Sequence, residues 1–140
     1  MLKVLFDPRV GPGAGSGHLR RCLRLARAHG EGAAVLLEAA EEARGDGLDG
    51  ASAETALAGD RSAQAAVDRL AAGVPVLRAF PDGADWDLVV MDRRASATAE
   101  LERFLPVPVI GLDEGGPARG FAPYLIDSLA SGTRWGRSAK

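Results

Sequence analysis

Residues 1–30 read MLKVLFDPRVGPGAGSGHLRRCLRLARAHG, and this stretch decides the fold. The apolar run over 2–6 predicts a buried strand of a parallel sheet. An eleven-residue loop over 7–17 follows, and four of its residues are glycines. Beyond the loop, apolar residues recur at the spacing of one helix face, at Leu19, Cys22, Leu23 and Ala26. This spacing predicts an amphipathic helix that ends at Gly30.

Apolar and helix-favouring segments alternate along the rest of the chain. The apolar segments predict strands over 33–37, 74–77, 87–91, 107–112 and 124–126. The segments that favour a helix are 38–44, 52–58, 60–71 with Asp60 as its N-cap, and 96–104 with Ser96 as its N-cap. Such an alternation predicts an α/β fold, a Rossmann-like parallel sheet with helices on both faces. We expect one domain over 1–130, followed by a polar, basic segment over 131–140 that is either a tail or the stump of a linker.

Composition excludes several classes of protein. The 140 residues include 17 basic and 19 acidic side chains, so a net charge of −2 argues against a nucleic-acid binder. No apolar run approaches the roughly 20 residues of a membrane span, and we expect neither a transmembrane segment nor a leader. The single cysteine, Cys22, cannot form an internal disulfide, which favours a cytoplasmic location. Its place among the apolar residues of the helix predicts a buried, inert thiol. No His, Cys or Asp cluster has the spacing of metal ligands, and we expect neither a metal nor a cofactor.

The glycine-rich loop that leads into the first helix predicts an anion site. A phosphate-binding P-loop would need a Gly-Lys-Ser/Thr sequence there, and the loop holds no lysine. The dinucleotide fingerprint Gly-x-Gly-x-x-Gly also fails, because its third position falls on Ser16 or His18. Glu38 nevertheless stands where a ribose-binding acid would stand. A nucleotide-binding Rossmann protein that uses Glu38 therefore stays as the weaker alternative.

The stretch Gly17-His18-Leu19-Arg20-Arg21-Cys22-Leu23 resembles a motif of GT-B-type nucleotide-sugar enzymes, in the glycine-rich loop and first helix of their N-terminal domain. It is most similar to the UDP-sugar hydrolases of pseudaminic-acid biosynthesis, whose pattern runs Gly-His-x-x-Arg-Cys-Leu. The lipid II-forming N-acetylglucosaminyltransferases share, more loosely, a glycine-rich loop with a histidine. The strand ends at 89–92 and 110–114 also look like those of the hydrolases, although this chain has Glu114 where they often carry a second aspartate. The resemblance covers most of residues 1–130.

The resemblance implies that His18 is a general base, which takes a proton from water in a hydrolase or helps to place the acceptor in a transferase. A place in the first turn of a helix supports this role, because the helix dipole disfavours the imidazolium and a neutral ring can accept a proton. One turn further on, Arg21 is positioned to hold an anionic or hydroxyl-rich substrate. The alternative without a functional role is that His18 only caps the helix and that Arg21 is a solvated surface charge.

Three glycines of the loop, Gly13, Gly15 and Gly17, are expected to shape the space in which substrate binds. The acidic residues at the strand ends are Asp7, Asp92 and Asp113. They either cap the segments that follow or surround the ligand and orient His18 or sugar hydroxyls. For Asp92 we favour the capping role. We leave the role of Asp113 open, and it joins the candidate substrate-binding residues.

In GT-B enzymes a second, C-terminal domain grips the nucleotide diphosphate, and 140 residues leave no room for one. The resemblance therefore implies the N-terminal, acceptor-side half of a nucleotide-sugar hydrolase or glycosyltransferase. We expect it to bind a nucleotide sugar or a sugar acceptor. Either the chain is an excised or truncated half, or a second protein chain supplies the C-terminal domain. The alternative from another class is a non-catalytic binding or interaction module of the same fold that acts with a partner chain.

Overall fold

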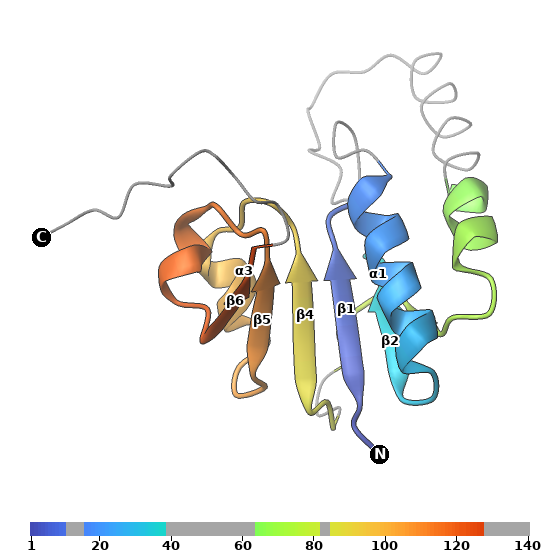
Figure 1. Ribbon diagram of the computed structural model, residues 1–140, viewed down its shortest axis with the longest axis horizontal. Coiled ribbons are helices and arrows are strands. Elements are labelled where there is room, and N and C mark those ends of the chain that lie inside the picture. Colours follow the sequence, from blue (N-terminus) through green and yellow to red (C-terminus); the bar gives the residue numbers. More distant parts are fainter. Residues whose placement is uncertain (11–15, 39–63, 82–84, 128–140) are drawn as a thin grey trace, which may run out of the picture.

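Six parallel strands form one sheet, in the order β3-β2-β1-β4-β5-β6 (Figure 1). The computed structural model describes residues 1–10, 16–38, 64–81 and 85–127. The strands are β1 (Val4–Pro8), β2 (Ala33–Leu36), β3 (Val76–Leu77), β4 (Leu88–Asp92), β5 (Val109–Leu112) and β6 (Tyr124–Ile126). The prediction of an α/β Rossmann-like sheet is therefore confirmed.

Helices cover both faces of this sheet. They are α1 (Gly17–His29), a helical segment whose described part is 64–71, α3 (Thr98–Glu102) and a short 3₁₀ helix η1 (Pro117–Gly120). The helix α1 ends at Gly30, whose φ of 79° lies in the left-handed region that favours glycine. Gly73, with a φ of 80°, follows the segment 64–71. Both glycines end helices where the sequence predicted.

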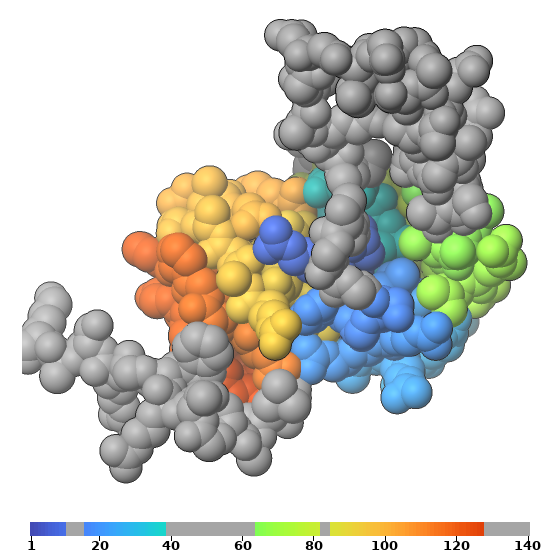
Figure 2. Space-filling view, turned by 90° about the horizontal axis from the view of Figure 1, so that it is seen from above, coloured from blue at the N-terminus to red at the C-terminus, as the bar shows by residue number. Residues whose placement is uncertain are grey.

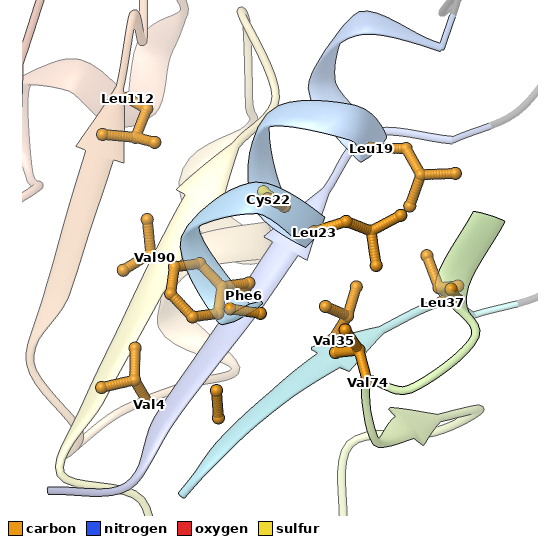
Figure 3. Packing of buried hydrophobic residues seen from close by; sticks show 13 residues of the cluster. Val4, Phe6, Leu19, Cys22, Leu23, Val35, Leu37, Val74, Val90 and Leu112 are labelled. Carbon is orange, nitrogen blue, oxygen red and sulfur yellow. The ribbon is translucent and has the colours of Figure 1, made fainter. Parts of the chain in front are cut away.

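Two apolar clusters form the core, one on each face. On one face, the buried residues of α1 pack on alternate side chains of β1 and β2 (Figure 3). This cluster includes Phe6, Leu19, Cys22, Leu23, Val35 and Val90. On the other face, Leu101 and Phe104 pack on the strand residues of opposite parity, which include Leu5, Leu36, Val89 and Met91. Since side chains alternate along a strand, neighbouring strand residues belong to different clusters.

The helix expected over 96–104 is shorter than predicted at both ends, because α3 spans Thr98–Glu102. Ala97, and not Ser96, is the N-cap residue of α3. The backbone N–H of Ser96 donates to Oε1 of Glu114 over 2.9 Å, and the buried Ser96 hydroxyl has no partner among the described residues. Glu100 caps the helix instead, because its Oε2 accepts from the backbone N–H of Ala97 over 2.8 Å. Ser96 therefore lies one residue before the N-cap, and its hydroxyl does not cap the helix.

The other predicted elements lie near their expected positions. The first strand is shifted to Val4–Pro8, and the strand predicted over 74–77 is shortened to Val76–Leu77. The strand at 107–112 begins at Val109, directly after Pro108, in keeping with a proline at a strand start. The predictions over 39–63 and the predicted tail over 131–140 lie outside the described residues.

The strand order reverses between β1 and β4, which pair with Pro8 opposite Asp92. The connection after β1 leads to α1 on one face, whereas the connection after β4 leads to α3 on the other. Figure 2 views this carboxyl edge, where the chain after β1 (dark blue) lies between the residues after β4 (yellow) and α1 (lighter blue). Open parallel sheets bind ligands at such a switch point.

Candidate functional site

His18 contacts a buried carboxylate at the switch point. Its Nδ1 lies 2.6 Å from Oδ1 of Asp92, the last residue of β4. The Asp92 side chain is fully buried, while the His18 side chain is 18% exposed. A carboxylate beside Nδ1 favours the tautomer with its proton on that nitrogen, so that Nε2 keeps its lone pair. The ring is thereby oriented for proton transfer at Nε2.

Arg21 holds the same carboxylate from the next turn of α1. Its Nε donates to Oδ2 of Asp92 over 2.6 Å, and its Nη2 donates to Oδ1 over 2.5 Å. Its Nη1 donates to Oδ2 of Asp113 over 2.5 Å. The hydrogen bonds to Asp92, followed by that to Asp113, raise the pKa of Arg21 above its ordinary value, so the guanidinium stays charged. The guanidinium of Arg21 therefore forms a bidentate ion pair with the buried carboxylate of Asp92.

These contacts correct the capping role that we favoured for Asp92. Asp92 orients His18 and binds Arg21, which is the sharper of the two alternatives. The description of Arg21 as a solvated surface charge is wrong as well, because its side chain is two-thirds buried and its fork faces two carboxylates. A direct contact of Arg21 with substrate stays a prediction. Within the described residues, Arg21 positions the carboxylate that positions the histidine.

Asp113 joins this network from the end of β5. Its φ of 50° lies in the left-handed region, which aspartate tolerates better than most residues. Its backbone N–H donates to the carbonyl of Ile126 in β6 over 2.9 Å. Asp113 thus links β5, β6 and α1, and its role in binding substrate stays a prediction. We name the network of His18, Arg21, Asp92 and Asp113 the histidine cluster.

The structure describes one of the three candidate glycines. Gly17 is the first residue of α1, and a Cβ built on it meets nothing within 4 Å. Close packing against the described residues therefore does not require glycine at this position. Gly13 and Gly15 lie outside the described residues.

Cys22 lies directly behind the histidine cluster. Its side chain is fully buried, and its Sγ lies 4.0 Å from Oδ2 of Asp92. Burial is the main cause that raises the pKa of the thiol, and the negative charge of Asp92 raises it further. The thiol therefore stays protonated at neutral pH and is no nucleophile. The prediction of a buried, inert thiol is confirmed as to burial.

A second group of charges lies on the opposite face of the sheet. Asp7, near the end of β1, is buried and accepts two hydrogen bonds from Arg93, each 2.7 Å long. Arg103 lies 3.4 Å from the same carboxylate and donates to Oε2 of Glu38 over 2.5 Å. Burial raises the pKa of Asp7, and the hydrogen bonds from Arg93 offset part of that effect. The sequence reasoning named Asp7 and Glu38 but missed both arginines.

A pocket of about 780 Å³ lies over this second group. Its charged lining residues are Asp7, Arg9, Glu38, Arg78, Arg93, Glu100 and Arg103. They come from the carboxyl ends of β1, β2, β3 and β4 and from α3 and its C-terminal end. We name this cavity the arginine pocket. The one signal that could have located it is the alternation along β1, which sends Asp7 to the face opposite Phe6.

Glu114 fixes the loops beside the histidine cluster. It is buried, and its Oε1 accepts from the backbone N–H groups of Ser96 over 2.9 Å and of Gly116 over 2.7 Å. The loop after β4 is thereby tied to the loop after β5. Glu114, which departs from the aspartate of the resembled family, acts on the backbone here.

Comparisons with protein-family models, curated proteins and solved structures found no match. None of the helices in the described part of the chain has the length and apolar character needed to cross a membrane. Among residues 1–10, 16–38, 64–81 and 85–127, no three His, Cys, Asp or Glu side chains gather in a way that could hold a metal ion.

Proposed function

We propose that this domain is the acceptor-side, N-terminal half of a nucleotide-sugar hydrolase or glycosyltransferase that acts on a UDP-sugar, with His18 as its general base. The observation that carries the proposal is the contact of 2.6 Å between His18 Nδ1 and the buried Asp92 carboxylate. A histidine that is only a helix cap has no need of a buried acid behind it. The resemblance of residues 17–23 to the hydrolase motif points to the same role.

In the proposed reaction, Nε2 of His18 accepts a proton from water or from an acceptor hydroxyl. The oxygen that loses the proton bonds to the anomeric carbon of the sugar, and the bond from that carbon to the phosphate oxygen breaks. The electron pair of that bond leaves with UDP, and the proton stays on His18 until solvent removes it. Asp92 stabilises the imidazolium that forms, as a carboxylate behind a catalytic histidine does.

In this scheme Arg21 and Asp113 act on the base indirectly, through Asp92. Asp92 holds His18 in this scheme, and the hydrogen bonds from the guanidinium of Arg21 hold the Asp92 side chain in place. The scheme also needs a nucleotide-binding domain, because binding energy from the nucleotide is needed to position the sugar. We place the reaction in the cytoplasm, where the single thiol of Cys22 stays reduced.

The test is an assay of UDP release from UDP-sugars, with the chain alone and with chains that carry a C-terminal nucleotide-binding domain. We expect turnover in one such pairing, and a loss of roughly 10²- to 10⁴-fold in kcat for His18→Ala. His29→Ala is the matched control, since His29 is exposed at the other end of the same helix, and the hydrogen bond described for it is with the carbonyl of Leu2. If no pairing gives turnover, the proposal fails and a non-catalytic module remains. If His18→Ala keeps full activity, His18 is not the general base and the proposal fails on that point.

A further inference from the structure

The arginine pocket lies on the face opposite the histidine cluster and has no role in the reaction proposed above. Its volume of about 780 Å³ is within the range of roughly 300–1,000 Å³ that small-molecule sites occupy. It lies at the carboxyl ends of the strands where the strand order reverses, the general place of ligand sites in open parallel sheets. Four arginines and three carboxylates line it.

The arginines of the pocket differ in how many of their N–H groups already donate to protein acceptors. The carboxylate of Asp7 takes two donors of Arg93, and Glu100 takes a third over 2.6 Å. Arg9, in contrast, is exposed, and the one contact described for its guanidinium is from Nη1 to the carbonyl of Ala95, at 2.9 Å. Arg9 therefore offers most of its five N–H donors to a ligand.

The guanidinium of Arg103 lies over the Phe104 ring, 4.5 Å from its centroid, but not all of its N–H groups have acceptors among the described residues. Its buried Nε–H has no acceptor among the described residues, and its contact with Asp7 is long, at 3.4 Å. Its one short ion pair is with Glu38, and both side chains of that pair are about one-third exposed, at 29% and 33%. Solvent screens a pair at this degree of exposure in part, so an incoming anion can compete with Glu38 for the guanidinium of Arg103.

Glu38 supplies a hydrogen-bond acceptor in the same pocket. Its Oε2 accepts from Arg103, and its other carboxylate oxygen has no hydrogen bond described among residues 1–10, 16–38, 64–81 and 85–127. A carboxylate with a spare oxygen at the rim of a pocket accepts hydrogen bonds from hydroxyl groups. The lining thus pairs donors for an anion with an acceptor for hydroxyls.

We propose that the arginine pocket binds a small sugar phosphate, with Arg9 and Arg103 on the phosphate and Glu38 on a sugar hydroxyl. A phosphate group suits this lining better than a carboxylate, because its three terminal oxygens accept from two guanidinium forks at once. A sugar suits it better than a nucleobase, because none of the described lining residues is aromatic. This binding does not depend on His18.

Isothermal titration calorimetry tests the proposal, with ribose 5-phosphate, inorganic phosphate and ribose as separate probes. We expect ribose 5-phosphate to bind with a Kd below about 1 mM, and ribose to bind at least about tenfold more weakly. Arg9→Gln should weaken the binding of ribose 5-phosphate at least about tenfold. Glu38→Gln should reduce the preference for ribose 5-phosphate over inorganic phosphate without weakening inorganic phosphate.

Two controls separate this site from diffuse charge and from the proposed reaction. Arg24→Gln changes an exposed arginine of α1 and should leave the Kd unchanged, as should His18→Ala. Absence of binding, or equal losses in Arg9→Gln and Arg24→Gln, would overturn the proposal. Equal affinity for inorganic phosphate and ribose 5-phosphate would refute the contact between Glu38 and the sugar. A loss of binding in His18→Ala would overturn the independence of the two sites.

Discussion

Asp7 and Asp92 lie near the ends of adjacent strands, and their carboxylates face opposite sides of the sheet. Pro8 pairs with Asp92 across the two strands, so Asp7 and Asp92 differ by one position in register. Asp92 accordingly meets His18 and Arg21 on the side of α1, whereas Asp7 meets Arg93 on the side of α3. Two separate charge networks at one edge of the sheet follow from this single step in register.

Asp92 is expected to support stability as well as the proposed reaction. Asp92→Asn keeps the shape of the side chain but removes the charge that faces Arg21, so we expect unfolding in urea to need about 2–4 kcal/mol less free energy. Asp85→Asn, at an exposed position, is the matched control and should change stability by less than about 0.5 kcal/mol. Equal stabilities of the two variants would mean that the contacts of Asp92 contribute nothing net.

A double-mutant cycle isolates the pair of Asp92 with Arg21. Because the two side chains share hydrogen bonds of 2.5 and 2.6 Å, we expect the losses from Asp92→Asn and Arg21→Met to add up to more than the loss in the double variant. The coupling should lie in the range of about 0.5–3 kcal/mol. Additive losses, measured by the same urea titrations, would show that the two side chains do not stabilise each other.

Asp7 predicts an unusual pH dependence of stability. Burial raises its pKa in the folded state above the model value of 3.8, so the folded protein takes up this proton at a higher pH than the unfolded chain. As pH falls from the folded pKa towards 3.8, the contribution of Asp7 to stability must therefore increase, by about 1.4 kcal/mol for each pH unit between the two values. A carboxylate with a lowered pKa would show the opposite sign.

Urea titrations of the wild type and Asp7→Asn at several pH values measure this sign. The stability of the wild type minus that of the variant should increase as the pH is lowered through the window. A difference that shrinks instead would mean that Arg93 outweighs burial at this carboxylate. If Asp7→Asn fails to fold, a carbon-13 titration of the Asp7 carboxyl in the wild type tests the same direction.

Cys22 should react with thiol reagents only when the protein unfolds. The side chain is fully buried, and burial keeps its thiol protonated, so neither access nor thiolate is available in the folded state. We expect an aromatic disulfide reagent to label no thiol in native protein at pH 8 and one thiol per chain in urea. Rapid labelling of the native protein would contradict the packing of α1 on the sheet.

Local patterns explain what the sequence predicted well. The strands and α1 follow from short apolar runs and from helical spacing, which depend only on neighbouring residues. The partner of His18 does not: Asp92 is 74 positions away in the chain, and the contact depends on strand order and on which face each side chain takes. For the same reason the sequence did not indicate a role for Arg93. This residue follows Asp92 in the chain, but its side chain lies on the other face of the sheet. Which charged side chains lie close together in this fold depends on the register of the strands. The composition of the sequence does not reveal that register.

The loop contact beneath the histidine cluster gives a steric prediction at Gly116. A Cβ built there would lie 2.7 Å from the backbone nitrogen of Ser96, 2.9 Å from Cα of Ala95 and 2.9 Å from the carbonyl oxygen of Ser96. These atoms are backbone and are held by Glu114, which accepts from both Ser96 and Gly116. Gly116→Ala must therefore separate the two loops that Glu114 joins.

We expect Gly116→Ala to lower the free energy of unfolding by about 2 kcal/mol or more, because the clash cannot be relieved by a side-chain rotation. Gly120→Ala is the matched control, since Gly120 lies four residues on, in η1, and a Cβ there meets no atom of the described residues within 4 Å. That variant should be neutral or slightly more stable, because alanine restricts the unfolded chain more than glycine. Thermal unfolding followed by circular dichroism compares the two directly. Equal melting temperatures would mean that the loops after β4 and β5 are not held in contact by Glu114.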